Sequence, residues 1–230
     1  PMSLHLYNTA SRSIEEFVPL NAPIVTMYAC GPTVYDYTHI GHLRKYIGDD
    51  ILRRTLTLLG YKVKHVMNIT DVGHLTNDSD EGDDKFEKKA SVEGKSVWDI
   101  AELYTDYFHT SMQAVNVLAP TIEPRATTHV PQMVALVEQL IAKGFAYETS
   151  QAIYFDVAKD PAYGELSGQK LEQKEIGARD DVVTDPDKHH PADFALWFKR
   201  VGKFADHAMY WASPWGGGFP GWHIECSAMS

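Results

Sequence analysis

The spacing of apolar residues changes twice in the first third of the chain. Residues 23–30 form a short apolar run next to proline, which predicts a buried strand. From Gly41 onward, apolar residues recur at steps of three and four, and Gly60 follows where a helix C-cap belongs. The residues of this predicted helix stripe are Leu43, Ile47, Ile51, Leu52, Leu56 and Leu59. Residues 61–70 are rich in β-forming residues and partly alternate in polarity, so they predict a second strand.

The order strand, glycine-containing loop, helix, strand is typical of the βαβ unit of a parallel nucleotide-binding sheet. In such a unit, the loop after the first strand lies at the carboxyl edge of the sheet, where ligands bind. In this chain that loop starts at Cys30 and ends with His39, Gly41 and His42. We therefore expect residues 30–42 to lie at a binding site.

Helical spacing returns in the middle of the chain. Ser96 and Asp99 match a capping box, and the apolar stripe behind them predicts a core helix. That stripe consists of Val97, Ile100, Ala101, Tyr104, Tyr107, Phe108 and Val115. A second helix is predicted to start at Pro131 and to end before Gly144, and residues 145–157 alternate like a β-hairpin.

These elements predict an α/β fold with an insertion. Residues 75–193 are expected to form an α+β insertion between two parts of the nucleotide-binding fold, residues 1–74 and 194–230. Residues 194–200 are apolar enough to return to the nucleotide-binding sheet.

Two stretches lack a regular period. Residues 77–89 are strongly charged, and the register of a calcium loop fails there because Lys88 stands where a bidentate glutamate belongs, so we predict a solvated loop. Residues 213–221 are rich in glycine and proline and predict a loop, after which residues 222–229 begin a helix.

Composition narrows the class of protein. The 230 residues, 44% hydrophobic and 11% aromatic, can fill the core of one or two domains. A formal charge of −10 argues against non-specific polyanion binding over the whole surface. No apolar run approaches the roughly 20 residues of a membrane helix and no secretory leader is visible, so we predict a cytoplasmic protein with no membrane partner. Pro1 and Met2 are interpreted as a cloning remnant.

The histidines at the loop-to-helix junction are candidate phosphate ligands. Backbone N–H groups at a helix N-terminus favour anions, and a histidine on the first turn can donate to a phosphate oxygen. Gly41 leaves room for a ligand beside His39 and His42. Two ordinary surface or capping histidines would give the same pattern.

The two cysteines are candidate metal ligands. Without a secretory leader, Cys30 and Cys226 are not expected to form a disulfide framework, and composition alone is compatible with two unrelated buried thiols, a metal site or catalysis. Both should reach the same sheet edge, and two thiolates in one cleft suit zinc. His223, three residues before Cys226, is either a third ligand or a solvent-facing or stacking histidine.

Several separated motifs then match a known family. They are CGPTVYDYTHIGH (30–42), NITDV (68–72), EPRAT (123–127), GARDDVV (177–183), ADFALW (192–197) and SPWGGGFPGWHIECSAM (213–229). In this order they resemble the bacterial cysteinyl-tRNA synthetases, a family of class I aminoacyl-tRNA synthetases. The resemblance implies a Rossmann-like catalytic domain with a parallel sheet, the HIGH motif and an inserted α+β connective domain. It also implies ATP-dependent activation of L-cysteine to cysteinyl-adenylate, with Mg²⁺, and transfer to tRNA(Cys).

The resemblance also implies roles for individual residues. The catalytic residues that contact the ATP phosphates would be His39 and His42. The adenylate pocket would be completed by Gly31, Thr33 and Gly41. The residues around the substrate cysteine would be Cys30, Gly31, Thr33, Thr70 and Trp222. One zinc ion, held by Cys30 and Cys226, would select cysteine over serine because an alcohol is a poor ligand for a soft metal site.

The family pattern continues past the last residue of this chain. An HHENE-like segment with two further zinc ligands, a KMSKS loop and a helical anticodon-binding domain do not occur up to Ser230. We therefore expect an N-terminal fragment with an incomplete zinc site, incomplete activity and an exposed sheet edge that could support dimerisation. Two alternatives stay open: a ligase that passes cysteine to a small amine, as in mycothiol-type biosynthesis, and a non-catalytic module that binds ATP or tRNA.

Overall fold

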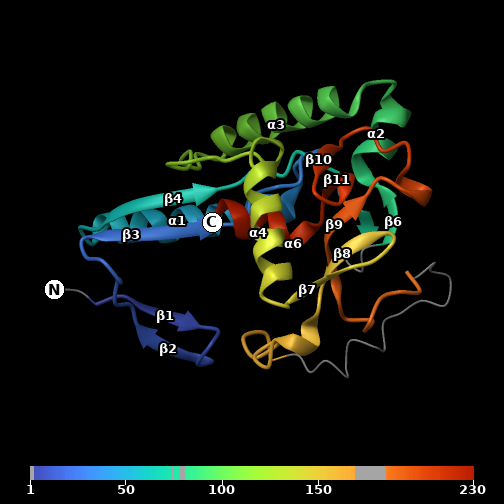
Figure 1. The fold of residues 1–230 in the computed structure, drawn as a ribbon. Helices are drawn as coiled ribbons and strands as arrows, with labels where there is room; N and C mark the ends of the chain where they lie inside the picture. The colour runs from blue at the N-terminus through green and yellow to red at the C-terminus, as the bar shows by residue number, and fades with distance from the viewer. Residues whose placement is uncertain (1–2, 74, 78–80, 169–184) are drawn as a thin grey trace.

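The computed structural model describes residues 3–73, 75–77, 81–168 and 185–230. The presumed remnant Pro1 and Met2 and the motif at 177–183 lie outside the described residues, as do residues 78–80 of the charged stretch. Two sheets dominate the structure, with helices α4 and α6 between them and helix α3 along one side (Figure 1).

The predicted βαβ unit is confirmed. Strands β3 (Ile24–Ala29) and β4 (Lys62–Met67) pair in parallel, from Ile24 opposite Lys62 to Ala29 opposite Met67. Helix α1 (Ile40–Leu58) makes the crossover between them. The segment at 121–126 runs along the other side of β4, where the Met67 amide donates to the Ile122 carbonyl at 3.1 Å. The parallel sheet therefore continues one step beyond β4.

The buried face of α1 differs from the predicted stripe. Leu56 is buried as expected, but Ile51 is 60% exposed, and Asp50 is buried instead. The Asp50 carboxylate accepts hydrogen bonds from Arg54 Nε at 2.6 Å and from the Leu118 amide at 3.2 Å. Because the carboxylate is satisfied in this way, a charged residue that was not part of the apolar stripe can be buried.

The predicted helices in the middle of the chain form. They are α3 (Val97–Ala114) and α4 (Val130–Ala142), and they are preceded by α2 (Lys85–Glu93), which was not predicted. The capping box is confirmed, since the Asp99 amide donates to Ser96 Oγ at 3.1 Å. Most of the α3 stripe is buried, but Tyr107 is 42% and Val115 36% exposed. The side of the helix that faces the core is therefore narrower than the predicted stripe.

A second, antiparallel sheet has the strand order β10-β11-β9-β8-β7. Its strands are β7 (Ala146–Glu148), β8 (Ala152–Phe155), β9 (Phe194–Lys199), β10 (Trp211–Ser213) and β11 (Gly216–Pro220). The predicted hairpin at 145–157 is β7–β8. Strand β9 was expected in the nucleotide-binding sheet, but it pairs with β8, from Ala152 opposite Phe198 to Phe155 opposite Phe194. The continuous apolar run of β9 predicts burial on both faces of the strand, but it does not indicate which strand pairs with β9.

The glycine-rich stretch at 213–221 is a β-hairpin arm and not the predicted loop. A Cβ on Gly218 would lie 2.1 Å from the Phe198 carbonyl oxygen and 2.4 Å from Trp197 Nε1. Glycine is therefore what lets β11 approach β9 so closely.

The charged stretch at 77–89 is also more ordered than predicted. It contains strand β6 (Glu81–Asp84) and the start of α2, and β5 (Leu75–Asn77) pairs with β6. Asp84, only 4% exposed, caps α2 by accepting from the Phe86 amide at 2.7 Å. Its other oxygen lies 3.0 Å from Nε2 of the buried His207. A buried partner far along the chain thus removes Asp84 from solvent.

One apolar core runs through both sheets. It includes Ile69 after β4, Ile100 of α3, Met133 of α4, Trp197 of β9 and Ile224 of helix α6 (Trp222–Met229). Helix α6 packs against α4 and β9, so it bridges the two sheets (Figure 1). The remaining elements are the hairpin β1 (His5–Asn8) and β2 (Ser13–Glu16) and the short 3-10 turns η1 (Ala126–Thr128), η2 (Val157–Lys159) and η4 (Gly202–Phe204).

None of the helices in the described part of the chain is both long and apolar enough to cross a membrane.

Candidate active site

The two cysteines lie in contact at the carboxyl edge of the parallel sheet. Cys30 follows directly after β3, and Cys226 lies on α6. Their sulfur atoms are 3.7 Å apart, although the residues are 196 positions apart in sequence. Cys30 is exposed, whereas burial raises the pKa of the Cys226 thiol to about 12. The prediction that both thiols reach one sheet edge is thus matched by the fold.

The loop after Cys30 runs alongside the chain that leaves β4. Thr33 and Thr70 form a parallel bridge, and the Val34 amide donates to the Thr70 carbonyl at 3.1 Å. A Cβ on Gly31 would lie 1.5 Å from the Asn68 carbonyl oxygen, so only glycine fits there. Gly31, Thr33 and Thr70 are therefore brought together beside the cysteine pair.

The two histidines cap α1 and stack on each other. Nδ1 of His39, the N-cap residue, accepts from the Gly41 amide at 3.1 Å, and the His39 amide donates to Nδ1 of His42 at 3.3 Å. Since each Nδ1 accepts a backbone hydrogen, each neutral ring carries its proton on Nε2. Burial, and then the neighbouring His39, lower the pKa of His42. The helix therefore begins with two Nε2–H donors at an end that attracts anions.

Packing explains the glycine at position 41 in a way that the sequence did not predict. A Cβ at this position would lie 2.8 Å from Cε1 of His39. The glycine therefore makes room for the stacked histidine ring, in addition to any ligand.

Thr70 is buried, and its hydroxyl is engaged. It accepts from Asn68 Nδ2 at 3.0 Å and lies 3.4 Å from Oε2 of the buried Glu225 on α6. Trp222 stands at the first position of α6, 37% exposed, with the Lys85 ammonium 5.5 Å from its ring. Trp222 and Cys226 are one turn apart on the same helix and share a face.

His223 does not join the cysteines. Its ring packs edge-on against Phe194 of β9, with the ring centroids 4.7 Å apart. Across the described ranges, no three histidine, cysteine, aspartate or glutamate side chains gather as a metal site would require. Of the two interpretations of His223, the stacking histidine is the one found.

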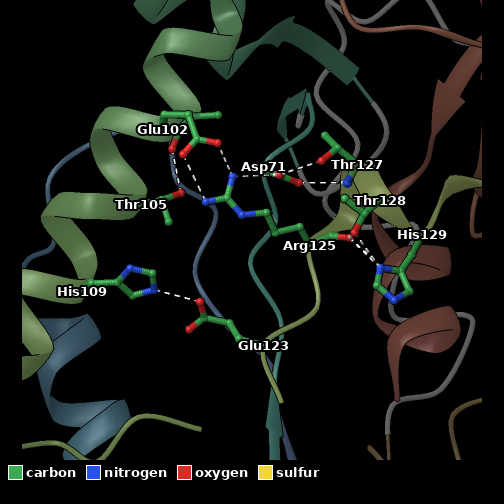
Figure 2. A network of polar contacts seen from close by, with 10 residues as sticks. Asp71, Glu102, Thr105, His109, Glu123, Arg125, Thr127, Thr128 and His129 are labelled. Carbon is green, nitrogen blue, oxygen red and sulfur yellow. Dashed lines mark hydrogen bonds and ion pairs between the residues drawn. The ribbon is translucent and has the colours of Figure 1, made fainter. Parts of the chain in front are cut away.

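A polar network that includes Asp71, Thr127, Arg125 and Glu102 anchors residues 68–71 (Figure 2). Asp71 accepts from the Thr127 amide at 2.9 Å and from the Thr127 hydroxyl at 2.8 Å. Arg125 lies 3.8 Å from Asp71 and forms a forked pair with Glu102 on α3. Burial raises the pKa of Asp71, and the bonds from Thr127 and the charge of Arg125 oppose that rise. The motif at 123–127 thus fastens α3 to the chain that carries Thr70.

Three polar residues at the site were missed by the sequence reading. Tyr28, Asn68 and Lys45 all contact the loop at Cys30 and Gly31 or its supports. The position of Asn68, directly after an apolar strand, was a usable signal because chemistry-bearing residues collect at the carboxyl ends of parallel strands. Lys45 carried no such signal, because its sequence context is that of an ordinary charged residue on a helix surface.

Comparison with known proteins identifies relatives along the whole chain. The chain is 50% identical over 229 residues to a cysteine–tRNA ligase of Treponema denticola, covering 100% of this chain and 46% of the relative. It is 49% identical over 231 residues to a cysteine–tRNA ligase of Thermus thermophilus, covering 100% of this chain and 47% of the relative. The chain thus spans about half the length of the curated relatives it matches.

A solved structure and a family profile also match. The structure is a LeuRS–tRNA–LeuAMS ternary complex from Agrobacterium radiobacter, 23% identical, with a TM-score of 0.42 over 58% of this chain and 16% of that chain, a similarity too low to support an argument. The family profile, described as the catalytic domain of tRNA synthetases class I (C), matches residues 16–230. Because that match covers nearly the whole chain, this protein belongs to the family of class I (C) tRNA synthetase catalytic domains.

Proposed function

We propose that this chain carries the ATP- and cysteine-binding part of a cysteine–tRNA ligase. Such an enzyme activates L-cysteine with ATP and Mg²⁺ and passes it to tRNA(Cys). The observation that carries the proposal is the contact between Cys30 Sγ and Cys226 Sγ, 3.7 Å apart at the sheet edge where α1 begins. The names of relatives that are 50% and 49% identical support the same function.

The sulfur pair fits two of the four ligand positions of a tetrahedral zinc ion. Two thiolates bound to tetrahedral zinc at about 2.3 Å lie about 3.8 Å apart. The separation of Cys30 Sγ and Cys226 Sγ is 3.7 Å, so these two residues would supply two of the ligands of the ion. When bound, zinc would supply a soft Lewis acid that accepts the substrate thiolate and discriminates against the serine hydroxyl.

The histidine pair would bind the phosphates of ATP. Residues 39–42, which read HIGH, present the Nε2–H groups of His39 and His42 at the N-terminus of α1. As the cysteine carboxylate attacks the α-phosphorus and pyrophosphate leaves, charge builds on the phosphoryl oxygens. Donors fixed before the reaction stabilise that charge without reorganising. Gly31, Thr33 and Gly41 would line the adenylate beside them.

Thr70 and Trp222 would border the substrate cysteine. Thr70 follows β4 and pairs with Thr33, while Trp222 stands one helical turn before Cys226. The two residues therefore come from different elements. In this proposal residues 75–193 are the connective insertion between parts 1–74 and 194–230, and β9 joins the insertion and the third part in one sheet.

Binding of a stable adenylate analogue tests the proposal. We expect cysteinyl-sulfamoyl-adenylate to bind the 230-residue chain, and the seryl analogue to bind at least tenfold more weakly in calorimetry. Cys30→Ser should remove that preference together with any bound zinc, which metal analysis would measure. Equal affinity for the two analogues, or no binding of either, would overturn the assignment. Cysteine-dependent ATP–pyrophosphate exchange, with serine as control, then measures how much activation the chain supports.

A further inference from the structure

The peptide group between Cys30 and Gly31 is held from both sides. Its carbonyl, on Cys30, accepts a hydrogen bond from Lys45 Nζ at 2.6 Å. Its N–H, on Gly31, donates to Asn68 Oδ1 at 2.9 Å. Because the two polar groups of a trans peptide point in opposite directions, the two side chains fix the plane of this peptide. The Cys30 side chain leaves the backbone directly beside that plane.

Asn68 also connects the peptide to the rest of the site. Its side chain is fully buried, and Oδ1 accepts a second hydrogen bond from the Tyr28 hydroxyl at 2.9 Å. The same oxygen lies 4.0 Å from Cys226 Sγ, and Nδ2 donates to Thr70 Oγ1 at 3.0 Å. One side chain thus contacts both chain segments that bring the sulfurs together.

Lys45 is itself held in place. Its ammonium forms an ion pair with Asp49 at 2.7 Å, one turn further along α1. The position three residues after His42 puts Lys45 on the same side of the helix as that histidine. The lysine therefore links the helix that begins at the histidine pair to the backbone of Cys30.

We propose that Asn68 and Lys45 are positioning residues that orient the Cys30–Gly31 peptide and so set the approach of Cys30 Sγ to Cys226 Sγ. Asn68 acts from the strand side and Lys45 from α1. The inference rests on the proposed function only in giving the sulfur pair its role as the cysteine-selecting centre. The placement of the sulfurs is a separate property and can be measured without substrate or metal.

Thiol–disulfide exchange measures that placement. The chain has two cysteines, so oxidation by glutathione disulfide in a metal-free buffer yields one intramolecular product. The two protein thiols lose two protons and two electrons and form an S–S bond, and glutathione disulfide takes both up to become two reduced glutathione molecules. Closing the pair shortens the separation of 3.7 Å to about 2.05 Å. The equilibrium constant of this exchange with glutathione measures how favourably the fold places the two sulfurs for bond formation.

Matched variants identify the positioning groups. Lys45→Met keeps the aliphatic stem and removes the donor, and Asn68→Leu keeps the volume and removes the acceptor. We expect each to lower the equilibrium constant about tenfold. Asn68→Asp, which keeps an acceptor oxygen for Gly31 and Tyr28, should recover most of the loss. Lys62→Met, at the amino end of β4 and away from the cysteines, should match the unchanged chain.

The outcomes separate the positioning role from a general structural one and from the proposed function. Circular dichroism and urea denaturation check that each variant folds. If Asn68→Leu does not fold, Lys45→Met alone tests the proposal, because the Lys45 side chain is 40% exposed and its replacement should not disturb folding. Equal constants for the unchanged chain and for folded Lys45→Met would overturn the proposal, as would failure of the unchanged chain to form the disulfide. If the adenylate analogue does not bind while the constants shift as expected, the proposed function fails and the positioning role stands.

Discussion

The buried pair of Asp84 and His207 predicts a pH-dependent part of the free energy of unfolding. The two residues are 4% and 3% exposed, and His207 Nε2 lies 3.0 Å from Asp84 Oδ2. His207 Nδ1 donates to the Met209 carbonyl at 2.8 Å, so a hydrogen on Nε2 as well makes the ring cationic. Burial disfavours that cation, but the hydrogen bond and charge of Asp84 outweigh burial and raise the pKa of His207.

The direction of the pH effect follows from that raised pKa. An unfolded histidine has a pKa of about 6.5. Because the folded-state pKa of His207 lies above this value, the stabilisation is fully present below the unfolded pKa. It is lost as the pH rises through the folded-state pKa of His207.

Asp84→Asn isolates this contribution. The asparagine oxygen can still accept from the Phe86 and Glu87 amides, now 2.7 and 3.0 Å from Asp84 Oδ1, and its amide can donate to a neutral His207. The loss is then the charged share of one buried hydrogen bond, about 1–2 kcal/mol. Asp84→Ala removes the helix cap as well and leaves Nε2 of the buried His207 without its carboxylate partner, which should cost about 3–5 kcal/mol.

Urea denaturation between about pH 5.5 and 9 tests this reasoning, since that range spans the titration of histidine. The difference in unfolding free energy between the unchanged chain and Asp84→Asn should be largest at the acidic end and shrink as the pH rises. A difference that stays constant or grows with pH would refute the assignment of the pH effect to this pair.

Three further variants test other parts of the structure. His65 is 4% exposed, and neither ring nitrogen has a hydrogen-bond partner within the described residues, so His65→Leu should raise the unfolding free energy by about 1 kcal/mol in urea denaturation. Gly41→Ala brings a Cβ within 2.8 Å of the His39 ring; we expect about tenfold weaker binding of cysteinyl-sulfamoyl-adenylate in calorimetry, and unchanged affinity would contradict the packing argument. Arg125→Met leaves the buried Asp71 without its cation and should lower stability by about 1–2 kcal/mol, whereas an unchanged urea midpoint would show that Thr127 alone satisfies the carboxylate.

The sequence predicted local elements well where one period dominates. The strands β3 and β4, the helix between them and the capping box at Ser96 each follow from a local pattern of about 20 residues or fewer, and the predicted helices form where expected. The contact between Cys30 and Cys226 was predictable for a different reason, because both were assigned to the carboxyl edge of one sheet.

Predictions failed where the deciding partner lies far along the chain. The charge pattern around Asp84 indicates solvent, whereas its second carboxylate oxygen is paired inside the protein with His207, 123 positions away. The apolar run of β9 predicts burial on both sides but not its pairing with β8. Residues 213–221 lack the side chains that signal a strand, because close packing on Trp197 and Phe198 requires glycine there. The roles given to the site residues stay predictions until ligand binding is measured.

The pairing of Phe155 with Phe194 has a consequence for how the chain can change in length. The chain leaves the antiparallel sheet after β8 and re-enters it at the adjacent position of β9. When the two ends of a flexible loop are fixed close together, doubling the length of the loop costs only about 0.6 kcal/mol of closure entropy. A single residue inserted between Gly221 and Cys226 would instead turn the sulfur by about 100° around α6 and carry it about 1.5 Å along the axis. Added length should therefore be tolerated at the exposed residues 165–167, which lie between β8 and β9, and a one-residue change in the first turn of α6 should not.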